Sequence, residues 1–428
     1  MMKTKIEDQD YVYNFIKDIC DKYGPRPPCS QAELNAIKDI GDQLSRIGCD
    51  EVFYDDFYCH PGAYPQGFVK IPFICLIMCL GLYPILPIIV PILTIFSLLV
   101  FFIEFPMMKE FIDPLFKKER SQNVFGKINS NKETRKLVII GGHVDSANVF
   151  PLFQKTRRSI LKYVFGTIGI WVVFMIISII TLFAPFNPFM LGLFSWVSIG
   201  PFPIYFNIFW LIFLGTFPFM AYVLLNTQFF TNPVMGANDN LSGTAIAMGV
   251  ANWILKNNKK YDYIELWCGA FGAEEAGQRG SKAFVKKYGD ELKILKNAYA
   301  LIPESVGVAD IIGFISAEQM HFVEHSKELV TRFEEAYKAC LVMIALSGEK
   351  FCKMGVSAQD FAGTDAMRFS EKKYEAIAFI GADKDDHWPL CYHSLEDNPK
   401  NIRSAPMRYL IEVILVFLDK LDKDLAKY

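Results

Sequence analysis

The chain lacks an excess of charge of either sign, because 44 Lys and Arg stand against 46 Asp and Glu, a formal net charge of −2. Without a basic surplus there is no bulk attraction to a polyanion, so no nucleic-acid partner is expected. The first ten residues also lack an apolar segment, so no cleavable signal peptide is expected. These absences argue against nucleic-acid binding and against a cleavable targeting segment.

The ten cysteines lack the compact spacing of a disulfide framework, and the sequence contains no Cys-x-x-Cys pair. Two of them, Cys75 and Cys79, lie inside an apolar run. In a long chain without an expected signal peptide, this usage indicates reduced, buried thiols and suits a cytoplasmic face. A cysteine-ligated zinc site is therefore not expected.

Hydrophobic residues make up 52% of the chain, and the excess is concentrated in two blocks. The first block, residues 71–104, is too long for one spanning helix of about 20 residues and has central prolines. It predicts a hairpin that either spans twice or re-enters. The second block contains two candidate spans, 162–183 and 204–226, and a shorter apolar stretch at 189–201. Such uncharged runs are rare in soluble domains, so an integral membrane protein in contact with the lipid bilayer is expected.

The orientation in the membrane follows from parity and from flanking charge. Both blocks interrupt a single predicted domain, so each crosses an even number of times, and two plus two is the simplest count. The predicted far-side turns, around Tyr83 and at 185–188, carry no Lys or Arg. The positive-inside rule therefore places the remaining domain on the cytoplasmic side. The basic flanking residues are Lys70, Lys109, Lys117, Lys118, Arg120, Lys155, Arg157, Arg158 and Lys162.

The segments outside the apolar blocks predict an α/β domain. Residues 32–48 have apolar side chains at helical spacing and end at Gly48, whereas residues 50–59 alternate like a strand. Apolar runs of strand length alternate with helix-like segments, which favours a mixed, mostly parallel central sheet flanked by helices. The runs are 136–142, 262–271, 297–303 and 374–381, and the helix-like segments are 241–256 and 406–425.

Acidic residues or histidines lie at the ends of these strands. Functional groups gather beyond the carboxyl ends of strands in α/β sheets, and a buried strand end seldom tolerates unpaired carboxylates. This clustering therefore predicts a metal site. The residues are His143 and Asp145 after the first run, Glu274 and Glu275 after the second, Glu304 after the third, Asp239 before residues 241–256, and His393 near the C-terminus.

The candidate donors are imidazoles and carboxylates without a thiol, which suits zinc and leaves manganese or cobalt open. Two divalent metal ions about 3.5–4 Å apart need a bridging carboxylate and further ligands for each ion. Five residues supply such a set, and Glu274 is left over as the general base that activated water requires. The five are His143, Asp239, Glu275, Glu304 and His393.

Several motifs in order resemble the di-zinc aminopeptidase and glutamate-carboxypeptidase family of zinc exopeptidases. The resemblance covers about residues 10–60, 120–150 and 230–425 and excludes the apolar blocks. A single motif of this kind is weak, whereas a series in order at compatible spacing is a strong signal. The motifs are GPRPPCS (24–30), GGHVDS (141–146), GANDNLSG (236–243), GAEEAGQRGS (272–281), ESVG (304–307) and YHSLEDNP (392–399).

The resemblance implies a zinc-exopeptidase fold and a role for each metal ligand. His143 is similar to a ligand of the first metal, and Asp239 is similar to the bridging carboxylate. Glu275 and His393 are similar to ligands of the second metal. Glu304 occupies the position of the remaining first-metal ligand, which is usually Asp in soluble members. Glu is one methylene longer and still able to coordinate, so the departure concerns metal spacing more than activity.

The resemblance also implies roles beyond the metal ligands. Glu274 is similar to the general base, and Asp145 to the carboxylate that orients His143. Beside these roles, Tyr392 is a candidate for contacting the oxyanion, and Asp365 for positioning the substrate or the site. The expected activity is a membrane-anchored, metal-dependent exopeptidase, an aminopeptidase that removes N-terminal residues from peptides by a two-zinc mechanism.

The domains expected from these patterns are five segments of one interrupted peptidase. A carboxypeptidase or a glutaminyl-cyclase-like enzyme on the same fold remains an alternative, although cyclases lack the first-metal histidine. A non-enzymatic membrane scaffold or receptor is the other alternative. The oligomeric state is not predicted. The segments are the N-terminal part at 1–68, a membrane hairpin at 69–105, the first metal motif at 106–158, a second membrane insertion at 159–228 and the remainder at 229–428.

Overall fold

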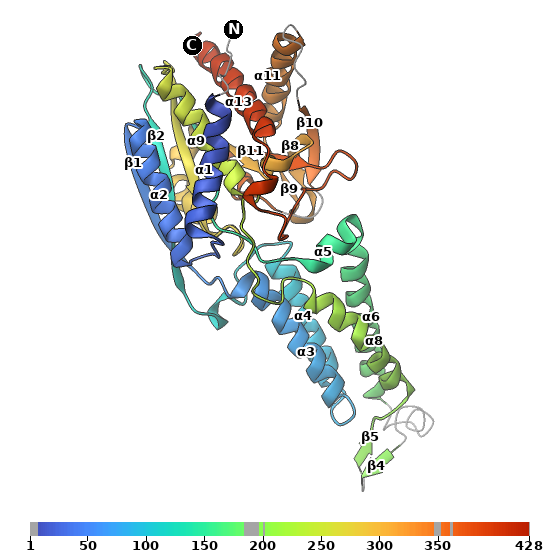
Figure 1. Cartoon of the computed structure of the whole chain (residues 1–428). Helices are drawn as coiled ribbons and strands as arrows, with labels where there is room; N and C mark the ends of the chain where they lie inside the picture. Colours follow the sequence, from blue (N-terminus) through green and yellow to red (C-terminus); the bar gives the residue numbers. More distant parts are fainter. Residues whose placement is uncertain (1–6, 184–196, 200–201, 346–351, 360–362, 428) are drawn as a thin grey trace. The chain divides into compact units, whose positions relative to one another are not determined.

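The computed structural model describes residues 7–183, 197–199, 202–345, 352–359 and 363–427. It divides the chain into two compact units, each made of segments that are distant in the sequence (Figure 1). The α/β unit comprises Met1–Pro61, Lys117–Val149 and Asn232–Tyr428. The helical unit comprises Gly62–Phe116 and Phe150–Thr231, the two regions that contain the apolar blocks.

Strands and helices alternate along the α/β unit. Its strands are β1 (Glu51–Cys59), β2 (Glu119–Ile128), β3 (Lys136–His143), β6 (Ile264–Phe271), β7 (Ala298–Glu304), β8 (Ile311–Glu318), β9 (Val323–Glu324), β10 (Lys353–Gln359) and β11 (Glu375–Ala382). Its α-helices are α1 (Glu7–Tyr23), α2 (Gln31–Ile47), α9 (Leu241–Lys256), α10 (Arg279–Phe284), α11 (Lys327–Ala345), α12 (Asp365–Glu371) and α13 (Ser404–Leu425).

Within the described residues, these nine strands form one mixed sheet in the order β1-β2-β6-β3-β7-β11-β8-β10, with β9 beside β8. The centre, from β6 through β3 and β7 to β11, is parallel. Toward one edge β2 and β1 are antiparallel, and toward the other β11 meets β8 antiparallel. The parallel centre brings the carboxyl ends of β6, β3 and β7 to the same edge of the sheet.

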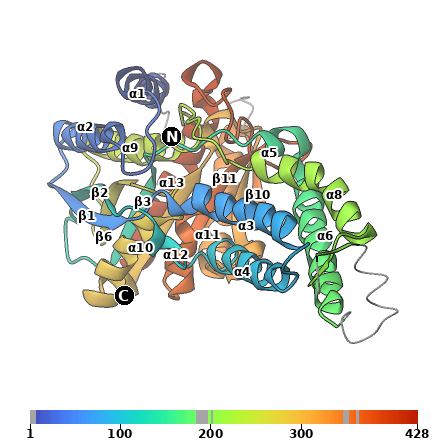
Figure 2. The same ribbon diagram turned by 90° about the horizontal axis from the view of Figure 1, so that it is seen from below.

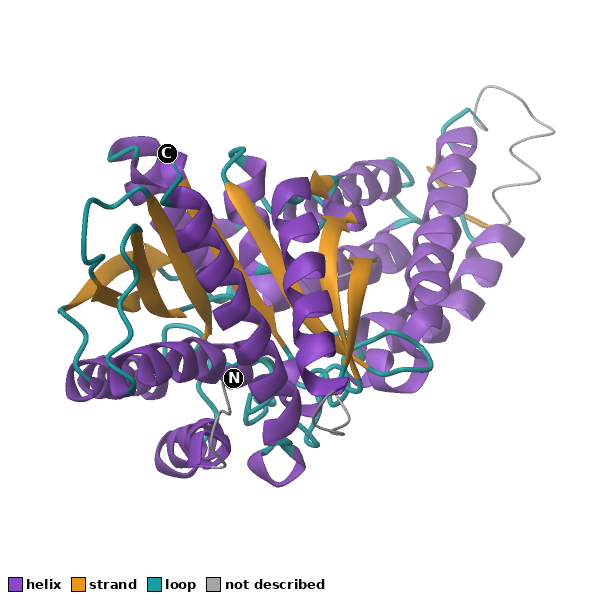
Figure 3. Cartoon of the chain, turned by 90° about the horizontal axis from the view of Figure 1, so that it is seen from above, coloured by secondary structure: helices purple, strands orange, loops and turns teal. Residues whose placement is uncertain are grey.

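Helices cover both faces of the sheet. One face packs in a large apolar cluster with α1, α2, α9, α11 and α13, and the other packs with α10 and α12. Figure 2 shows α2 and α9 on one side of the strands and α10 on the other, and Figure 3 shows the helices laid along the strands. The three-layer α/β architecture with a mostly parallel centre predicted from the sequence is confirmed.

Capping residues mark the ends of two of the predicted helices. The side chain of Ser30 accepts a hydrogen bond from the backbone N–H of Glu33 and caps α2, which ends at Gly48 in the left-handed region, φ 97°. Helix α9 spans the predicted residues 241–256 and is capped by Asn240. Strands β8 and β10 were not predicted, because glycine and polar residues interrupt their apolar pattern. Helix α11 was not predicted either, although Leu329, Phe333, Ala336 and Cys340 recur at helical spacing and are buried.

The helical unit contains five α-helices and a short antiparallel pair of strands among the described residues. Helices α3, α4, α6 and α8 pack in a closed ring, each against two of the others. The elements are α3 (Phe68–Leu82), α4 (Ile89–Glu104), α5 (Pro151–Thr156), α6 (Ile160–Thr181), β4 (Val197–Ile199), β5 (Phe202–Ile204) and α8 (Ile208–Leu225).

Three apolar helical segments of the helical unit are long enough to cross a membrane: Ala63–Leu82, Pro151–Thr181 and Ile208–Leu225. Helix α4 is shorter, at 16 residues, or about 24 Å at 1.5 Å per residue. The first block was predicted to span twice or to re-enter, and only its segment Ala63–Leu82, which includes α3, has the length of a span. Of the apolar stretch at 189–201, only residues 197–199 are among those described.

The outward face of these helices is apolar, whereas polar side chains bond to one another inside the unit. Tyr83 is buried, and its hydroxyl lies 3.0 Å from Thr181 Oγ1 and accepts from Asn207 Nδ2 at 3.2 Å. This pattern is the reverse of a water-soluble bundle. The exposed apolar side chains include Ile74, Ile77, Ile92, Ile95, Leu99, Phe102, Phe165, Val173, Ile176, Ile212 and Leu214.

Candidate functional site

The six predicted metal and base residues meet at one edge of the parallel centre of the sheet. His143 is the last residue of β3, and Glu304 is the last residue of β7. Glu274 and Glu275 lie on the loop after β6, two strands away from β7. Asp239 lies just before α9, and His393 comes from the turn region after β11. The parallel register therefore assembles residues that lie far apart along the chain.

Asp239 stands between the two histidines. His143 Nε2 lies 3.2 Å from Asp239 Oδ1, and His393 Nε2 lies 3.3 Å from Asp239 Oδ2. On the side of His143, here called the first side, Glu304 Oε1 is 3.6 Å from His143 Nε2. On the side of His393, the second side, Glu275 Oε1 is 3.3 Å from His393 Nε2. Each side thus has one histidine and one further carboxylate, and Asp239 offers a different oxygen to each.

These distances suit ligands that face a shared cation. The donor atoms of His143, Asp239 and Glu304 lie within 4.8 Å of one another, as do those of Asp239, Glu275 and His393. Asp239 Oδ2 is buried and has no hydrogen-bond partner among the described residues, although a histidine nitrogen lies 3.3 Å away. A buried carboxylate oxygen without a partner is costly. A divalent ion between Asp239 and the histidine would satisfy both, so the residues present fit a metal centre.

Protonation of the cluster follows from burial and crowding of charge. Burial opposes the charge on His143 and His393, but the surrounding carboxylates outweigh it, raising the pKa of His143 and bringing that of His393 to about 10. Burial raises the pKa of Glu274, Glu275 and Glu304 above the usual carboxyl range. The cluster therefore binds protons where a divalent cation would replace them, because metal ligands must be deprotonated.

Glu274 has the surroundings of a proton-transfer group. Its Oε2 is 3.7 Å from His143 Nε2, and its side chain is 12% exposed. Burial raises its pKa well above the usual value, opposed by His143 and reinforced by Asp365 and Glu275. A carboxylate whose pKa is raised is a stronger base, as abstraction of a proton from water requires.

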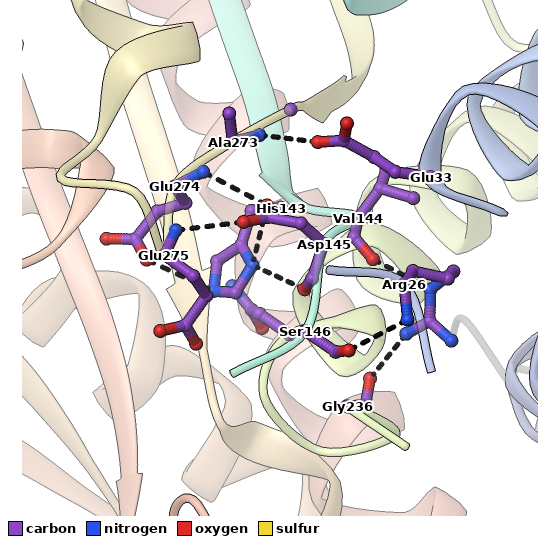
Figure 4. Close-up of polar contacts among 12 residues, drawn as sticks. Arg26, Glu33, His143, Val144, Asp145, Ser146, Gly236, Ala273, Glu274 and Glu275 are labelled. Carbon is purple, nitrogen blue, oxygen red and sulfur yellow. Dashed lines mark hydrogen bonds and ion pairs between the residues drawn. The ribbon is translucent and has the colours of Figure 1, made fainter. Parts of the chain in front are cut away.

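Asp145 holds the loop that carries Glu274 and Glu275 (Figure 4). Its Oδ1 accepts the backbone N–H of Glu274 at 3.0 Å, and its Oδ2 accepts that of Glu275 at 2.9 Å. Toward His143, the ring Nδ1 lies 3.1 Å from the Asp145 carbonyl oxygen and 3.4 Å from Oδ1. Asp145 thus lies beside His143, as the predicted orienting role requires. It also fixes the backbone of the loop that carries Glu274 and Glu275.

Two further carboxylates, neither of which was predicted from the sequence, hold loops of the site in the same manner. Asp397 accepts the backbone N–H groups of Asn238 and Asp239. Glu33 accepts the backbone N–H of Cys29 and that of Ala273, each at 2.7 Å. Asp397 lies within the quoted motif YHSLEDNP, so its motif position is the signal that was available.

Arg26 joins the loops after β3 and before α9 (Figure 4). Its guanidinium is fully buried and donates to the carbonyl oxygens of Val144 at 2.8 Å, Gly236 at 3.1 Å and Gly24 at 2.6 Å. Burial lowers its pKa, opposed by Cys20 and Asp397. A buried guanidinium that donates to three carbonyl oxygens fixes the positions of the backbone segments that carry them. Arg26 also lies in a quoted motif, GPRPPCS, but no role was assigned to it.

Backbone conformation fixes the ligands as well. Ala273, Ser305 and His393 have φ of 50°, 53° and 46°, in a region that residues with a side chain seldom adopt. At the end of β3, a Cβ on Gly142 would lie 2.5 Å from the backbone nitrogen of Thr244. Glycine therefore permits the close approach of β3 and α9 that sets the neighbouring histidine against the residues before α9.

The remaining candidates fall around this centre in different ways. Asp365 is fully buried, burial raises its pKa to about 6, and neither of its oxygens has a hydrogen-bond partner among the described residues. A direct contact with substrate would require that this carboxylate become exposed. The Tyr392 ring stacks on the His393 ring, with centroids 3.8 Å apart. Arg368, on the same helix as Asp365, is paired with Glu371 at 3.2 Å and donates to the Gly277 carbonyl, so its charge is already engaged within the protein.

Comparison with known families gives one match. The sequence model of the family described as Peptidase family M28 matches residues 222–418, slightly less than half of the chain. The matched region includes Asp239, Glu274, Glu275, Glu304 and His393, and His143 lies before it. A search of curated proteins gives no match.

Several solved structures share the fold at low sequence identity. A zinc aminopeptidase from Bacillus subtilis is 13% identical, with a TM-score of 0.54, and the match covers 96% of this chain and 95% of that one. A glutaminyl cyclase from Bacteroides thetaiotaomicron is 13% identical, with a TM-score of 0.52 and coverage of 96% and 97%. A Zn-dependent exopeptidase from Parabacteroides distasonis is 13% identical, with a TM-score of 0.52 and the same coverage.

Proposed function

Residues 222–418 match peptidase family M28, which supports a zinc-metallopeptidase-like hydrolase, and from this premise we propose that the chain is a membrane-anchored, two-metal aminopeptidase. The observation that carries the proposal is the position of Asp239, with one oxygen toward His143 and the other toward His393. A single carboxylate offered to two separate histidines is the arrangement that a bridging ligand needs.

The first ion is held in this proposal by His143, Asp239 and Glu304, and the second by Asp239, Glu275 and His393. Imidazole and carboxylate donors without a thiol favour zinc. Asn240 Nδ2 donates to Glu304 Oε2 at 2.8 Å, which leaves Oε1 turned toward His143. The longer side chain of Glu at this position is thus anchored by its neighbour while one oxygen stays available.

Zinc at these positions would polarise the scissile carbonyl and lower the pKa of water. Glu274 then acts as the proton carrier: its carboxylate takes a proton from the attacking water and delivers it to the departing amine. The bonds from Asp145 to the Glu274 and Glu275 amides fix that carboxylate relative to the second ligand set. Burial raises the pKa of Glu274, and the charge of Asp365 adds to this shift, which makes the Glu274 carboxylate a better acceptor for the proton of the attacking water.

Free N-terminal residues are the proposed substrate class. The carboxylates around the first side, Glu304 and Glu274, suit a substrate ammonium group. The buried Arg368 is already engaged by Glu371 and Gly277 and is not available for a substrate carboxylate. A glutaminyl-cyclase-like reaction is the second candidate, because glutaminyl cyclases are among the proteins of similar fold. The complete first ligand set with His143 favours the peptidase.

Membrane anchorage is proposed from the helical unit. Three of its helical segments have the length and composition of spans, and isoleucines such as Ile74 and Ile92 are more than half exposed. A contiguous apolar surface of this extent needs an apolar partner, and a bilayer supplies it. The basic residues that flank both apolar blocks place the α/β unit on the cytoplasmic side in this proposal.

The test uses detergent-purified full chain, with metal content and peptidase activity measured side by side. Wild type is expected to bind about two zinc ions and to release N-terminal residues from unblocked peptides but not from acetylated ones. Glu274→Gln is expected to keep its metal and to lose turnover by at least about 100-fold, the general-base contribution. Glu291→Gln, on an exposed position of the same unit, serves as the control and is expected to match wild type.

Wild type without bound metal, or turnover that is unchanged in Glu274→Gln, would contradict the peptidase proposal. Release of ammonia with ring closure from N-terminal glutaminyl peptides, without peptide-bond cleavage, would select the cyclase instead.

A further inference from the structure

Two thiols are in contact with each other next to the loop that carries Glu274. Cys29, in the turn before α2, and Cys59, the last residue of β1, have their sulfur atoms 3.2 Å apart. A disulfide bond length is about 2.05 Å. The two sulfurs are therefore in contact but not bonded, and a movement of about 1.2 Å would join them.

The surroundings favour pairing of these thiols. Cys59 is buried in a small apolar cluster with Phe57, Ala273 and Ala276, and Cys29 packs at its edge, partly exposed. Fixing two reacting groups in contact replaces a bimolecular encounter by an intramolecular one and greatly raises their effective concentration. Cys352, which is also partly buried, instead has its sulfur against the Asp310 carbonyl oxygen at 3.2 Å.

We propose that Cys29 and Cys59 are a reversible disulfide-forming pair whose oxidation restrains the loop that carries Glu274 and Glu275. The oxidant is a low-molecular-weight disulfide. The Cys29 thiolate attacks one sulfur of the oxidant and releases the first thiol, and Cys59 then attacks the Cys29 sulfur of the mixed disulfide and releases the second. The two cysteines give up two protons and two electrons, and the oxidant becomes two thiols.

The pair is connected to the metal site through Glu33. The Cys29 backbone N–H donates to Glu33 Oε2, and Glu33 Oε1 accepts from the N–H of Ala273, the residue directly before Glu274. Cys59 also contacts the same loop in the apolar cluster with Ala273 and Ala276. A bond between the sulfurs would thus fix Cys29, which is linked to Ala273 through Glu33, to Cys59, which packs against Ala273. The loop that carries Glu274 and Glu275 would then be held more firmly.

The reaction is expected to be slow at neutral pH. The contact with Cys59 and burial raise the pKa of Cys29, so little thiolate is present, and the thiolate is the attacking species. The rate of oxidation should therefore increase as the pH rises toward 9, while the final extent at a given ratio of thiol to disulfide stays set by proximity.

The first experiment maps the bond directly and needs no enzymatic activity. Detergent-purified full chain is equilibrated in a series of reduced to oxidised glutathione ratios, free thiols are alkylated, and digested peptides are identified by mass. The expected result is a Cys29–Cys59-linked peptide at ratios where Cys352 stays alkylated, with at least about tenfold preference, and its loss on return to excess thiol. Absence of the linked peptide at every ratio, including at pH 9, overturns the proposal.

The second measurement tests the connection to the loop, and this part rests on the proposed metal site. Oxidised protein is expected to lose zinc to a chelator several-fold more slowly than reduced protein. Cys29→Ser, at the partly exposed position, should abolish the difference, and Cys352→Ser should preserve it. A linked peptide with equal zinc loss in both states overturns the restraint, and a linked peptide in a protein that binds no zinc overturns the proposed function while leaving the pair established.

Discussion

Replacing Asp145 by Asn tests whether the buried carboxylate organises the metal site. Asp145 is completely buried and accepts two backbone N–H groups, one on each oxygen. Asparagine keeps the shape but has one carbonyl oxygen, so its NH₂ group must face one of the two N–H donors. Either Glu274 or Glu275 then has a buried amide without an acceptor.

The expected cost follows from that single lost acceptor. A buried donor without a partner costs about 1–3 kcal/mol, and the bond lost is charge-assisted, at about 1.5–3 kcal/mol. Removal of the charge offsets part of this, because Asp145 raises the pKa of the buried Glu33 and Asp365 by repulsion. A net loss of about 2 kcal/mol in unfolding free energy is expected, together with a 10–100-fold loss in metal affinity, the usual range for outer-sphere partners.

The assay is competition for zinc with a chromophoric chelator, run beside chemical denaturation. Asp18→Asn, at an exposed position on α1, is the control and is expected to match wild type in both measurements. If Asp145→Asn bound zinc within about twofold of wild type, the carboxylate would not organise the site, and the inference from its two hydrogen bonds would be refuted.

Three further predictions concern the metal count, pH and the membrane. His143→Ala is expected to bind one equivalent less of metal by elemental analysis while retaining the ion held by Asp239, Glu275 and His393; simultaneous loss of both ions would show that the sites are not separable. In metal-free protein, burial raises the pKa of Asp397 to about 7 and that of Asp365 to about 6, and His393 reaches about 10. At these three groups the folded state holds more protons than the unfolded state, so the stability that they contribute is complete below about pH 4 and is lost as the pH rises, by up to about 1.4 kcal/mol per unit for each group. Thermal unfolding between pH 5 and 9 should show this decline, and saturating zinc should weaken or reverse it. Val173→Lys, at an exposed position near the middle of α6, should reduce membrane integration, because a lysine at the centre of a span costs about 2.5–3.5 kcal/mol on insertion scales. Leu292→Lys in the α/β unit should integrate normally, and equal integration of the two variants would argue against α6 as a span.

The sequence was sufficient for the central strands and for the positions of the chemical groups. Continuous apolar runs at 136–142 and 297–303 became β3 and β7, because a strand buried on both faces requires an unbroken apolar sequence. The residues directly after such runs had to lie at one edge of a parallel sheet. His143 and Glu304 could therefore be placed together before any coordinates were known.

The edges of the sheet could not be predicted in the same way. Strands β8 and β10 carry polar residues and glycine within their apolar pattern. Strand β10 is an edge strand and pairs with β8 alone. Their formation depends on pairing with a partner distant in the sequence, and local propensity in strands is weak. The antiparallel step between β11 and β8 was likewise decided by packing.

The metal donors could be predicted from the sequence, whereas the residues that support them could not. The sequence alone determined the set of donors, because imidazole and carboxylate side chains at strand ends have few other uses in a buried place. Only the tertiary structure decided that Asp145, Asp397 and Glu33 each accept two backbone N–H groups from other loops. It also decided that Arg26 joins three carbonyl oxygens. Apart from the bonds of Cys29 to Glu33 and of Arg26 to Gly24, these bonds link groups far apart along the chain. A backbone group also has no side-chain identity that a sequence pattern can reveal.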